Sequence, residues 1–104
     1  MKQYFKDLDK AFDNKIRLGI MSVLMVNEYV SFNELKQWMS LTDGNLASHL
    51  KYLEKVDYIS INKSFLGRKP NTKYRATKLG KNAFKKHVNA LEKILKGGKH
   101  NDVT

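Results

Sequence analysis

The chain contains no cysteine and only half as many acidic as basic residues, ten against 20. Without cysteine it has no disulfide framework, no thiol nucleophile and no thiolate metal site, which excludes cysteine-based redox or metal sensing. The sequence also lacks an apolar run of about 18 residues, the length that a membrane span needs, and a signal-peptide pattern at its start. We therefore expect a cytoplasmic protein.

Catalytic and metal-binding motifs are missing as well. The sequence has no glycine-rich phosphate loop, no nucleophile elbow, no HExxH and no paired acid and base at helical spacing. His87 and His100 have no His or carboxylate partner at a metal-ligand spacing, so we predict that both are surface residues. We expect no enzyme activity, no metal and no cofactor.

The excess positive charge lies in the second part of the chain. Residues 1–60 hold eight Lys plus Arg and eight Asp plus Glu, whereas residues 61–104 hold 12 and two. A concentrated basic surface is typical of nucleic-acid binding, because phosphate contacts dominate non-specific affinity. The alternative is a solvated lysine-rich surface that aids solubility. At 104 residues the chain is expected to form one domain over residues 1–96, with a flexible tail over 97–104.

A helix is predicted to begin at Thr42, whose hydroxyl can cap the first turn. Leu46, Leu50 and Leu53 recur at helical spacing, with Val56 three residues later, which indicates one buried face. The opposite face is polar and consists of Asp43, Asn45, Ser48, His49, Lys51, Tyr52 and Lys55. Tyr52 on this face either reaches a DNA backbone or covers a neighbouring side chain, and the sequence leaves both readings open.

After Asp57 the pattern changes from helical to alternating, which predicts a β-hairpin over residues 58–76. Its strands are expected over residues 58–63, with Ile59 and Ile61 facing inward, and over residues 72–76. Residues 65–71 are expected to form an exposed, cationic tip, because glycine supplies backbone freedom and proline excludes a central strand position.

Helices are predicted in the rest of the chain. Tyr4, Phe5, Leu8 and Phe12 form an apolar stripe on an N-terminal helix over residues 1–13, and residues 14–27 form a central buried helix. Ser31 and Glu34 have the spacing of a capping box that starts the next helix, in which Trp38 is expected in the core. Thr77 is a candidate cap for the last helix, over residues 77–96.

The segments NELKQWM and LTDGNLASHLKYLEKVDYI, the basic hairpin and then TKLG resemble the small single-domain winged-helix transcriptional regulators of the MarR/ArsR kind, over roughly Asn14 to His87. This resemblance implies a mainly α fold with a small β-hairpin (α+β), a winged helix-turn-helix with added terminal helices. Residues 31–56 would be the helix-turn-helix and residues 58–76 the wing. Ala47 stands where relatives often carry Ser, and Asp57 where they often carry Gly.

The function expected from this resemblance is sequence-specific binding of double-stranded DNA by a transcriptional regulator, as a repressor. The helix beginning at Thr42 would enter the major groove and the wing would cover the neighbouring backbone or minor groove. The candidates for contact from the helix are Thr42, Asp43, Gly44, Asn45, Ser48, His49, Lys51, Tyr52 and Lys55, and those from the wing are Lys63, Arg68, Lys69, Lys73 and Arg75. The alternative is a winged-helix module that binds protein or RNA.

The last helix, at about 18 residues and about 27 Å, is longer than a core this small can cover. We therefore expect a homodimer whose interface consists of Tyr4, Phe5, Leu8, Phe12, Phe84, Val88, Leu91 and Leu95. The alternative is that the terminal helices pack within one subunit. Whether a small-molecule effector exists is left open, although a cleft between the terminal helices and the core could accept one.

Overall fold

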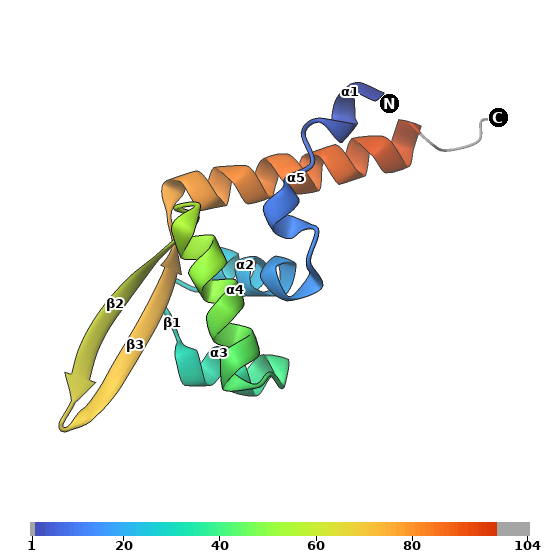
Figure 1. Ribbon diagram of the computed structural model, residues 1–104. Coiled ribbons are helices and arrows are strands. Elements are labelled where there is room, and N and C mark those ends of the chain that lie inside the picture. The colour runs from blue at the N-terminus through green and yellow to red at the C-terminus, as the bar shows by residue number, and fades with distance from the viewer. Residues whose placement is uncertain (1, 98–104) are drawn as a thin grey trace.

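The computed structural model describes residues 2–97, and within them helices surround one side of a small antiparallel sheet (Figure 1). In chain order the elements are α1 (Lys2–Phe5), the 3-10 helix η1 (Lys10–Phe12), α2 (Lys15–Val26), β1 (Val30–Ser31), α3 (Phe32–Met39), α4 (Asp43–Lys55), β2 (Ile59–Leu66), β3 (Lys69–Ala76) and α5 (Lys78–Gly97). The expected fold class, mainly α with a β-hairpin, is confirmed. The tail was predicted over residues 97–104; Gly97 is instead the last residue of α5, and residues 98–104 lie outside the described residues.

The core lies where α2 crosses the helix-turn-helix and the sheet. Ile20, Met21 and Leu24 of α2 are fully buried, as expected for the central helix. They pack with Leu35 of α3 and with the predicted buried face of α4, while the sheet supplies Val30, Ile59, Tyr74 and Ala76. Within the part of the chain that is described, no helix is long and apolar enough to cross a membrane.

Side-chain caps set the ends of the two helices of the helix-turn-helix. Ser31 Oγ accepts from the Glu34 N–H at 3.1 Å, and the Glu34 carboxylate accepts from the Ser31 N–H at 3.0 Å, so the predicted capping box is present. Thr42 Oγ1 accepts from the Asn45 N–H at 3.2 Å and starts α4 as expected. Asp57 ends the α4 turn with φ 63°, a left-handed conformation that glycine adopts most readily and that aspartate tolerates.

The hairpin is longer than predicted, because residues 65–71 are largely strand. Only Gly67 and Arg68 form the turn, and Leu66 pairs with Lys69 to close it. Gly67 has φ 65° whereas Arg68 does not have a positive φ, which matches a tight two-residue turn with glycine at its first central position. The glycine therefore closes a tight hairpin and not an open loop.

Pro70 lies inside β3, where the sequence pattern placed a loop. It is opposite Phe65, one pair beyond the closing pair, and such a pair exchanges no ladder hydrogen bonds. Within residues 2–97, nothing pairs with the side of β3 that its missing N–H would face, because β1 pairs with β3 only at Tyr74 and Lys73. The two-residue strand β1 was itself not predicted.

The predicted helix over residues 1–13 is wrong, since the chain breaks into α1 and η1. Asp9 causes the break: its carboxylate accepts from the Ala11 N–H at 2.9 Å as an N-cap, and its own N–H donates to Nδ1 of His87 at 2.9 Å. The break turns Phe12 inward, where it is 3% exposed and packs edge-on against the Phe84 ring.

Two further predictions are corrected. His87 is buried under the N-terminal segment and is not a surface residue, because Asp9 and Phe12 cover it. Trp38 is 54% exposed and is not in the core. Leu35 and Met39, four residues apart, face the core, while Trp38 falls on the side of this short helix. His100 lies outside the described residues.

Candidate nucleic-acid interface

The first turn of α4 is an exposed polar part of the helix-turn-helix. Thr42, Asp43, Gly44, Asn45 and Ser48 are all exposed. This turn and the turn of the hairpin lie on the lower side of the molecule in Figure 1, away from α5. One ligand could therefore contact both the first turn of α4 and the turn of the hairpin.

Local contacts already use some polar groups of this turn. Asp43 forms an ion pair with Lys36 of α3 at 2.8 Å, and Ser48 Oγ donates to the Asn45 carbonyl at 3.0 Å. The ion pair is exposed and contributes about 0–1 kcal/mol to stability. The ion pair also offsets the negative charge of Asp43 in the first turn of α4.

His49 and Tyr52 do not lie on the exposed face where the sequence pattern placed them. Both are half-buried and face α2, where the Arg17 guanidinium lies 4.1 Å above the Tyr52 ring. Arg17 Nη1 is also 3.3 Å from Nδ1 of His49. Tyr52 thus covers a neighbouring side chain, the second of the two readings that the sequence left open.

Burial lowers the pKa of His49, and the charge of Arg17 lowers it further. The imidazole is therefore predominantly neutral at neutral pH and presents no positive charge to phosphate. A neutral ring keeps one acceptor nitrogen, and that nitrogen suits the guanidinium beside it. Both the lowered pKa of His49 and its contact with Arg17 follow from the position of His49 against α2.

Arg17 is a residue that the sequence analysis missed. Its Nε donates to the Ala11 carbonyl at 2.7 Å, so one side chain joins η1, α2 and α4. The signal in the sequence was the isolated arginine in the apolar run that follows Lys15. A charged residue in such a run usually has a partner, because burying it unpaired is costly.

The wing cations do not form one surface. Successive strand residues point to opposite faces, so Lys63 shares a face with Ile59 and Ile61. Lys69, Lys73 and Arg75 lie on the other face, and Arg68 lies in the turn. Arg75 packs beside Tyr29, with Nη1 3.4 Å from its hydroxyl, and is held near the base of the wing.

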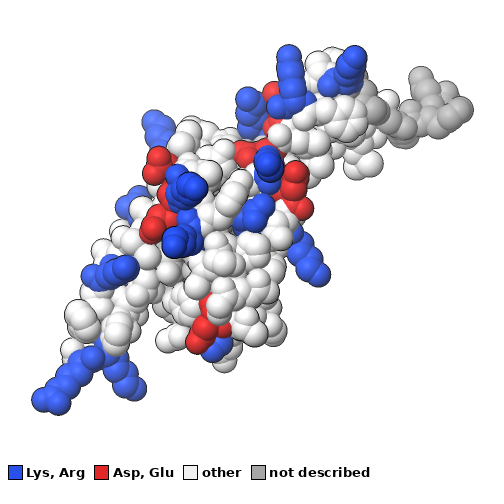
Figure 2. Space-filling view, in the orientation of Figure 1, with Lys and Arg blue, Asp and Glu red and all other residues white. Residues whose placement is uncertain are grey.

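The hairpin carries no negative charge at all, since residues 58–77 contain no Asp or Glu. Figure 2 shows only Lys and Arg among the charged side chains at its visible end. Among the described residues, the other basic side chains of the second part of the chain belong to α5, away from the start of α4. Several of these have partners: Lys86 lies 3.7 Å from Asp7, Lys96 lies 2.9 Å from Glu92 and Lys93 lies over the Tyr4 ring.

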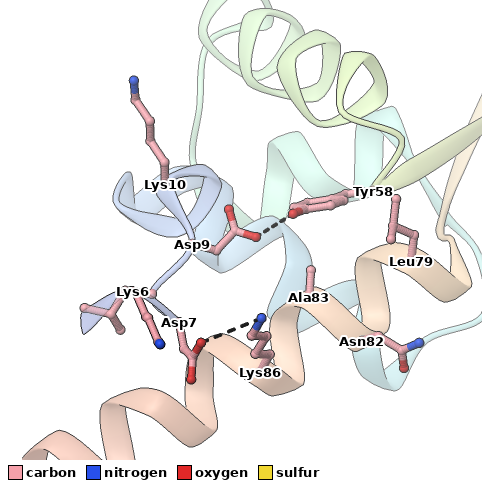
Figure 3. Close-up of a pocket in the computed structure, with 10 residues that line it drawn as sticks. Lys6, Asp7, Asp9, Lys10, Tyr58, Leu79, Asn82, Ala83 and Lys86 are labelled. Atoms are coloured by element: carbon pink, nitrogen blue, oxygen red, sulfur yellow. Dashed lines mark hydrogen bonds and ion pairs between the residues drawn. The ribbon is translucent and has the colours of Figure 1, made fainter. Parts of the chain in front are cut away.

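A hollow of about 430 Å³ lies between the N-terminal segment and α5 (Figure 3). Tyr58 Oη donates to the Asp9 carboxylate at 2.5 Å on one side of it, and Lys86 faces Asp7 on the other. Burial, together with the hydrogen bond to Asp9, raises the pKa of Tyr58 to about 12. Among the described residues no group of three or more His, Asp or Glu could hold a metal ion.

Comparisons with known proteins agree with this arrangement. An uncharacterised protein of Methanocaldococcus jannaschii is 36% identical over 87 residues, which cover 84% of this chain and 95% of that protein. The structure of a transcriptional regulator homologue from Pyrococcus horikoshii matches with 29% identity and a TM-score of 0.81, over 92% of this chain and 93% of that one. A protein of Porphyromonas gingivalis, described as a candidate MarR-family regulator, matches with 20% identity and a TM-score of 0.62, over 89% and 86%.

The likeness to the Porphyromonas gingivalis protein supports the fold alone. The family model described as "Winged helix DNA-binding domain" matches residues 16–95, which include the helix-turn-helix, the wing and most of α2 and α5. The resemblance to winged-helix regulators, first indicated by the order of short motifs, is thereby confirmed. The chain belongs to the winged helix DNA-binding domain family.

Proposed function

We propose that this protein is a transcriptional regulator that binds specific sequences in double-stranded DNA as a homodimer and acts as a repressor. One observation carries the proposal: the exposed polar first turn of α4 lies on the same side of the molecule as an acid-free, basic hairpin. Helix-turn-helix proteins place this turn against base edges in the major groove. Repression would follow from occupancy, because a bound dimer excludes other proteins from the same DNA.

Sequence preference is assigned to the first turn of α4. Asn45 suits adenine, whose N6 and N7 match a side-chain amide, and Ser48 can reach a neighbouring base or phosphate. Thr42 and Asp43 are occupied as cap and ion pair, and Gly44 allows close approach of the backbone. Lys51 and Lys55, which are exposed farther along α4, are assigned to the DNA backbone.

Affinity is assigned mainly to the wing. Arg68 in the turn is the best candidate for a narrow minor groove, because a weakly hydrated guanidinium enters it readily. Lys63 and Lys69 flank it on the two faces of the hairpin. Lys73 and Arg75 lie nearer the body of the molecule and are assigned to phosphates at the edge of the site.

The wing is tested with Arg68→Ala combined with Lys69→Ala. The logarithm of affinity falls with the logarithm of salt concentration at about 0.9 per phosphate neutralised, so the double variant should bind all duplexes more weakly and with a shallower salt slope. Lys81→Ala with Lys85→Ala is the matched control, since it removes two exposed charges from α5. An unchanged slope in the wing variant would contradict the assignment.

The helix is tested with Asn45→Ala and with Ser48→Ala. Each should weaken binding to a duplex selected from a random pool by about 1–3 kcal/mol per lost base contact, and leave binding to random DNA nearly unchanged. Gel shifts against both duplexes measure the difference. Equal losses on the two would place the specificity elsewhere, and displacement by folded RNA instead of duplex would favour an RNA-binding module.

The homodimer is supported by an uncovered apolar stripe along α5. Val88 is 42% exposed, Leu91 45% and Leu95 77%, and Phe5 of the adjoining α1 is 54% exposed. Phe12 and Phe84 are already packed against each other within the subunit, so we assign them to supporting the helices beneath the interface. Tyr4 and Leu8 are partly exposed and complete the proposed dimer surface.

A further inference from the structure

The end of the wing exposes two large apolar side chains that the proposed charge contacts do not explain. Phe65 is 71% exposed and Leu66 is 69% exposed, at the end of β2 just before the turn. A single exposed apolar residue needs no explanation, but these two stand at the end of a projecting hairpin. Neither belongs to the buried core or to the apolar residues packed against it.

The two side chains point to opposite faces of the hairpin. Phe65 lies on the face of Ile59, Ile61 and Lys63, and Leu66 lies on the other. Ile61 and Tyr74 border a small hollow together with Ala47 and Leu50 of α4, so the face that carries Phe65 is the one that looks toward α4. A duplex that touched the start of α4 would therefore meet Phe65 and not Leu66.

Charge identifies the kind of ligand that this apolar group would meet. The hairpin has no acidic residue, and Lys63, Arg68 and Lys69 surround the exposed pair. The matching surface is a polyanion with apolar area between its charges, which the minor groove of DNA provides between two phosphate rows. Proteins that insert Phe or Leu into the minor groove unstack a base step and bend the duplex by about 20–90°.

We propose that Phe65 is an apolar wedge that enters the minor groove next to the α4 site, opens one base step and bends the duplex. This inference rests on the proposed function, because it needs DNA lying across α4 and the wing. It predicts a preference for flexible pyrimidine–purine steps, such as TA or CA, at the position that the wing reaches. That preference would appear in DNA that α4 does not contact.

The wedge is tested with Phe65→Thr and with Leu66→Thr as its control. Each replaces a large apolar side chain by threonine, which keeps a high strand propensity at both positions. The probe is the duplex that the wild-type protein selects from a random pool, labelled at its ends for energy transfer and carrying 2-aminopurine at successive positions under the wing. Wild type and Leu66→Thr should shorten the end-to-end distance and raise the fluorescence of one 2-aminopurine. Phe65→Thr should abolish both changes and bind about tenfold more weakly.

Bending is measured at saturating protein, so weak binding cannot imitate the result. Phe65 also faces Pro70 across the hairpin, and thermal unfolding of both variants separates a loss of stability from a loss of bending. A bend that Phe65→Thr retains, a straight duplex with the wild type, or equal effects of the two substitutions would overturn the wedge. If no duplex is enriched at all, the proposed function fails first.

Discussion

At the scale of single residues, Arg17 connects the N-terminal segment to the helix proposed to read DNA. Its guanidinium donates to the Ala11 carbonyl, stacks on Tyr52 and contacts His49. A planar group with several donors can make these three contacts at once, and lysine cannot. The side of α4 that faces α2 is therefore fixed by one cation.

Replacing Arg17 with Met should raise the pKa of His49 toward its ordinary value. Burial, the larger cause of the depressed pKa, would remain, so the return should be partial. Proton NMR titration of the His49 ring measures the change. Lys15→Met is the control, because it removes an exposed charge two residues away on the same helix. An identical His49 titration in wild type and Arg17→Met would show that Arg17 has no electrostatic effect there.

The lowered pKa of His49 also makes the stability of the fold depend on pH. Near pH 6.5, the ordinary histidine value, the unfolded chain binds more protons at this site than the folded chain does. The contribution is therefore complete above that pH and is lost as the pH falls toward the folded-state pKa. In urea unfolding, wild type should lose more stability than His49→Gln over that window, and parallel pH profiles would contradict it.

Burial and the hydrogen bond to Asp9 raise the pKa of Tyr58 to about 12, whereas the ordinary tyrosine pKa is about 10. Its raised pKa means that the folded state holds the proton longer, so this stabilisation is lost as the pH rises from about 10 to about 12. In a titration followed by tyrosinate absorbance, the variant Tyr58→Phe should lack one of the groups that the wild type ionises at high pH. Asp9→Asn keeps a capping side chain and should lower the pKa of Tyr58 only partly, because burial is the larger cause of the raised pKa. A full return to the ordinary value would contradict that order.

At the scale of elements, the start of α5 fits closely against the turn that follows α4. The Thr77 hydroxyl accepts from the Gly80 N–H at 2.9 Å and donates to the Asp57 carbonyl at 2.6 Å. The Thr77 N–H donates to the Tyr58 carbonyl at 3.0 Å. These bonds hold the base of the wing, the end of α4 and the first turn of α5 in one arrangement.

Gly80→Ala should break this arrangement. A Cβ there would lie 2.0 Å from the Tyr58 carbonyl oxygen, and backbone on both sides leaves little freedom to move. We expect a loss of about 3 kcal/mol or more in the free energy of unfolding, measured with urea. Gly44→Ala is the control, since its Cβ would meet no atom within 4 Å, and helix propensity favours alanine there by up to about 1 kcal/mol. Similar stabilities for the two variants would contradict the close contact.

The sequence predicted those elements whose signals are local. Ser31 and Glu34, Thr42 and the leucines of α4 each specify a cap or a face within one or two turns of chain, and all were placed correctly. The hairpin turn was misplaced because Pro70 reads as a loop residue unless one knows which side of its strand is free. β1 escaped prediction because two residues carry no periodicity.

The candidate interface was predictable to the same extent. The exposed positions of α4 follow from its helical period, whereas the sideways placement of His49 depends on Arg17, 32 residues earlier. The burial of His87 depends on Asp9, 78 residues earlier. Contacts over such distances in the chain depend on the tertiary fold, and no spacing rule within one element can reveal them.

At the scale of the whole molecule, the hairpin and α5 extend in different directions from the core, and the longest dimension reaches 63 Å (Figure 1). This shape separates two surfaces. The wing and the start of α4, where we propose that DNA binds, lie on one side of the molecule, while α5, which carries the stripe proposed for the dimer, lies on the other side (Figure 1). A two-fold dimer through α5 could then present two DNA-binding surfaces to successive turns of one duplex, about 34–36 Å apart.

Leu91→Glu combined with Leu95→Glu should convert the protein to a monomer. Stable dimers bury about 1,200–2,000 Å² in total, and two glutamates within the exposed stripe would have to be desolvated on association. Sedimentation velocity at micromolar concentration should show a dimer for wild type and a monomer for the variant. Leu79→Glu is the control, because it places a charge on an exposed leucine of α5 about 18 Å from Leu91.

The same variants connect assembly to DNA binding. A monomer engages one half-site and neutralises half as many phosphates, so the salt slope of Leu91→Glu with Leu95→Glu should fall to about half that of wild type. Leu79→Glu should keep both the dimer and the full slope. A wild-type protein that sediments as a monomer would remove the dimer from the mechanism. A dimer whose loss leaves the slope unchanged would show that each subunit binds DNA independently of its partner.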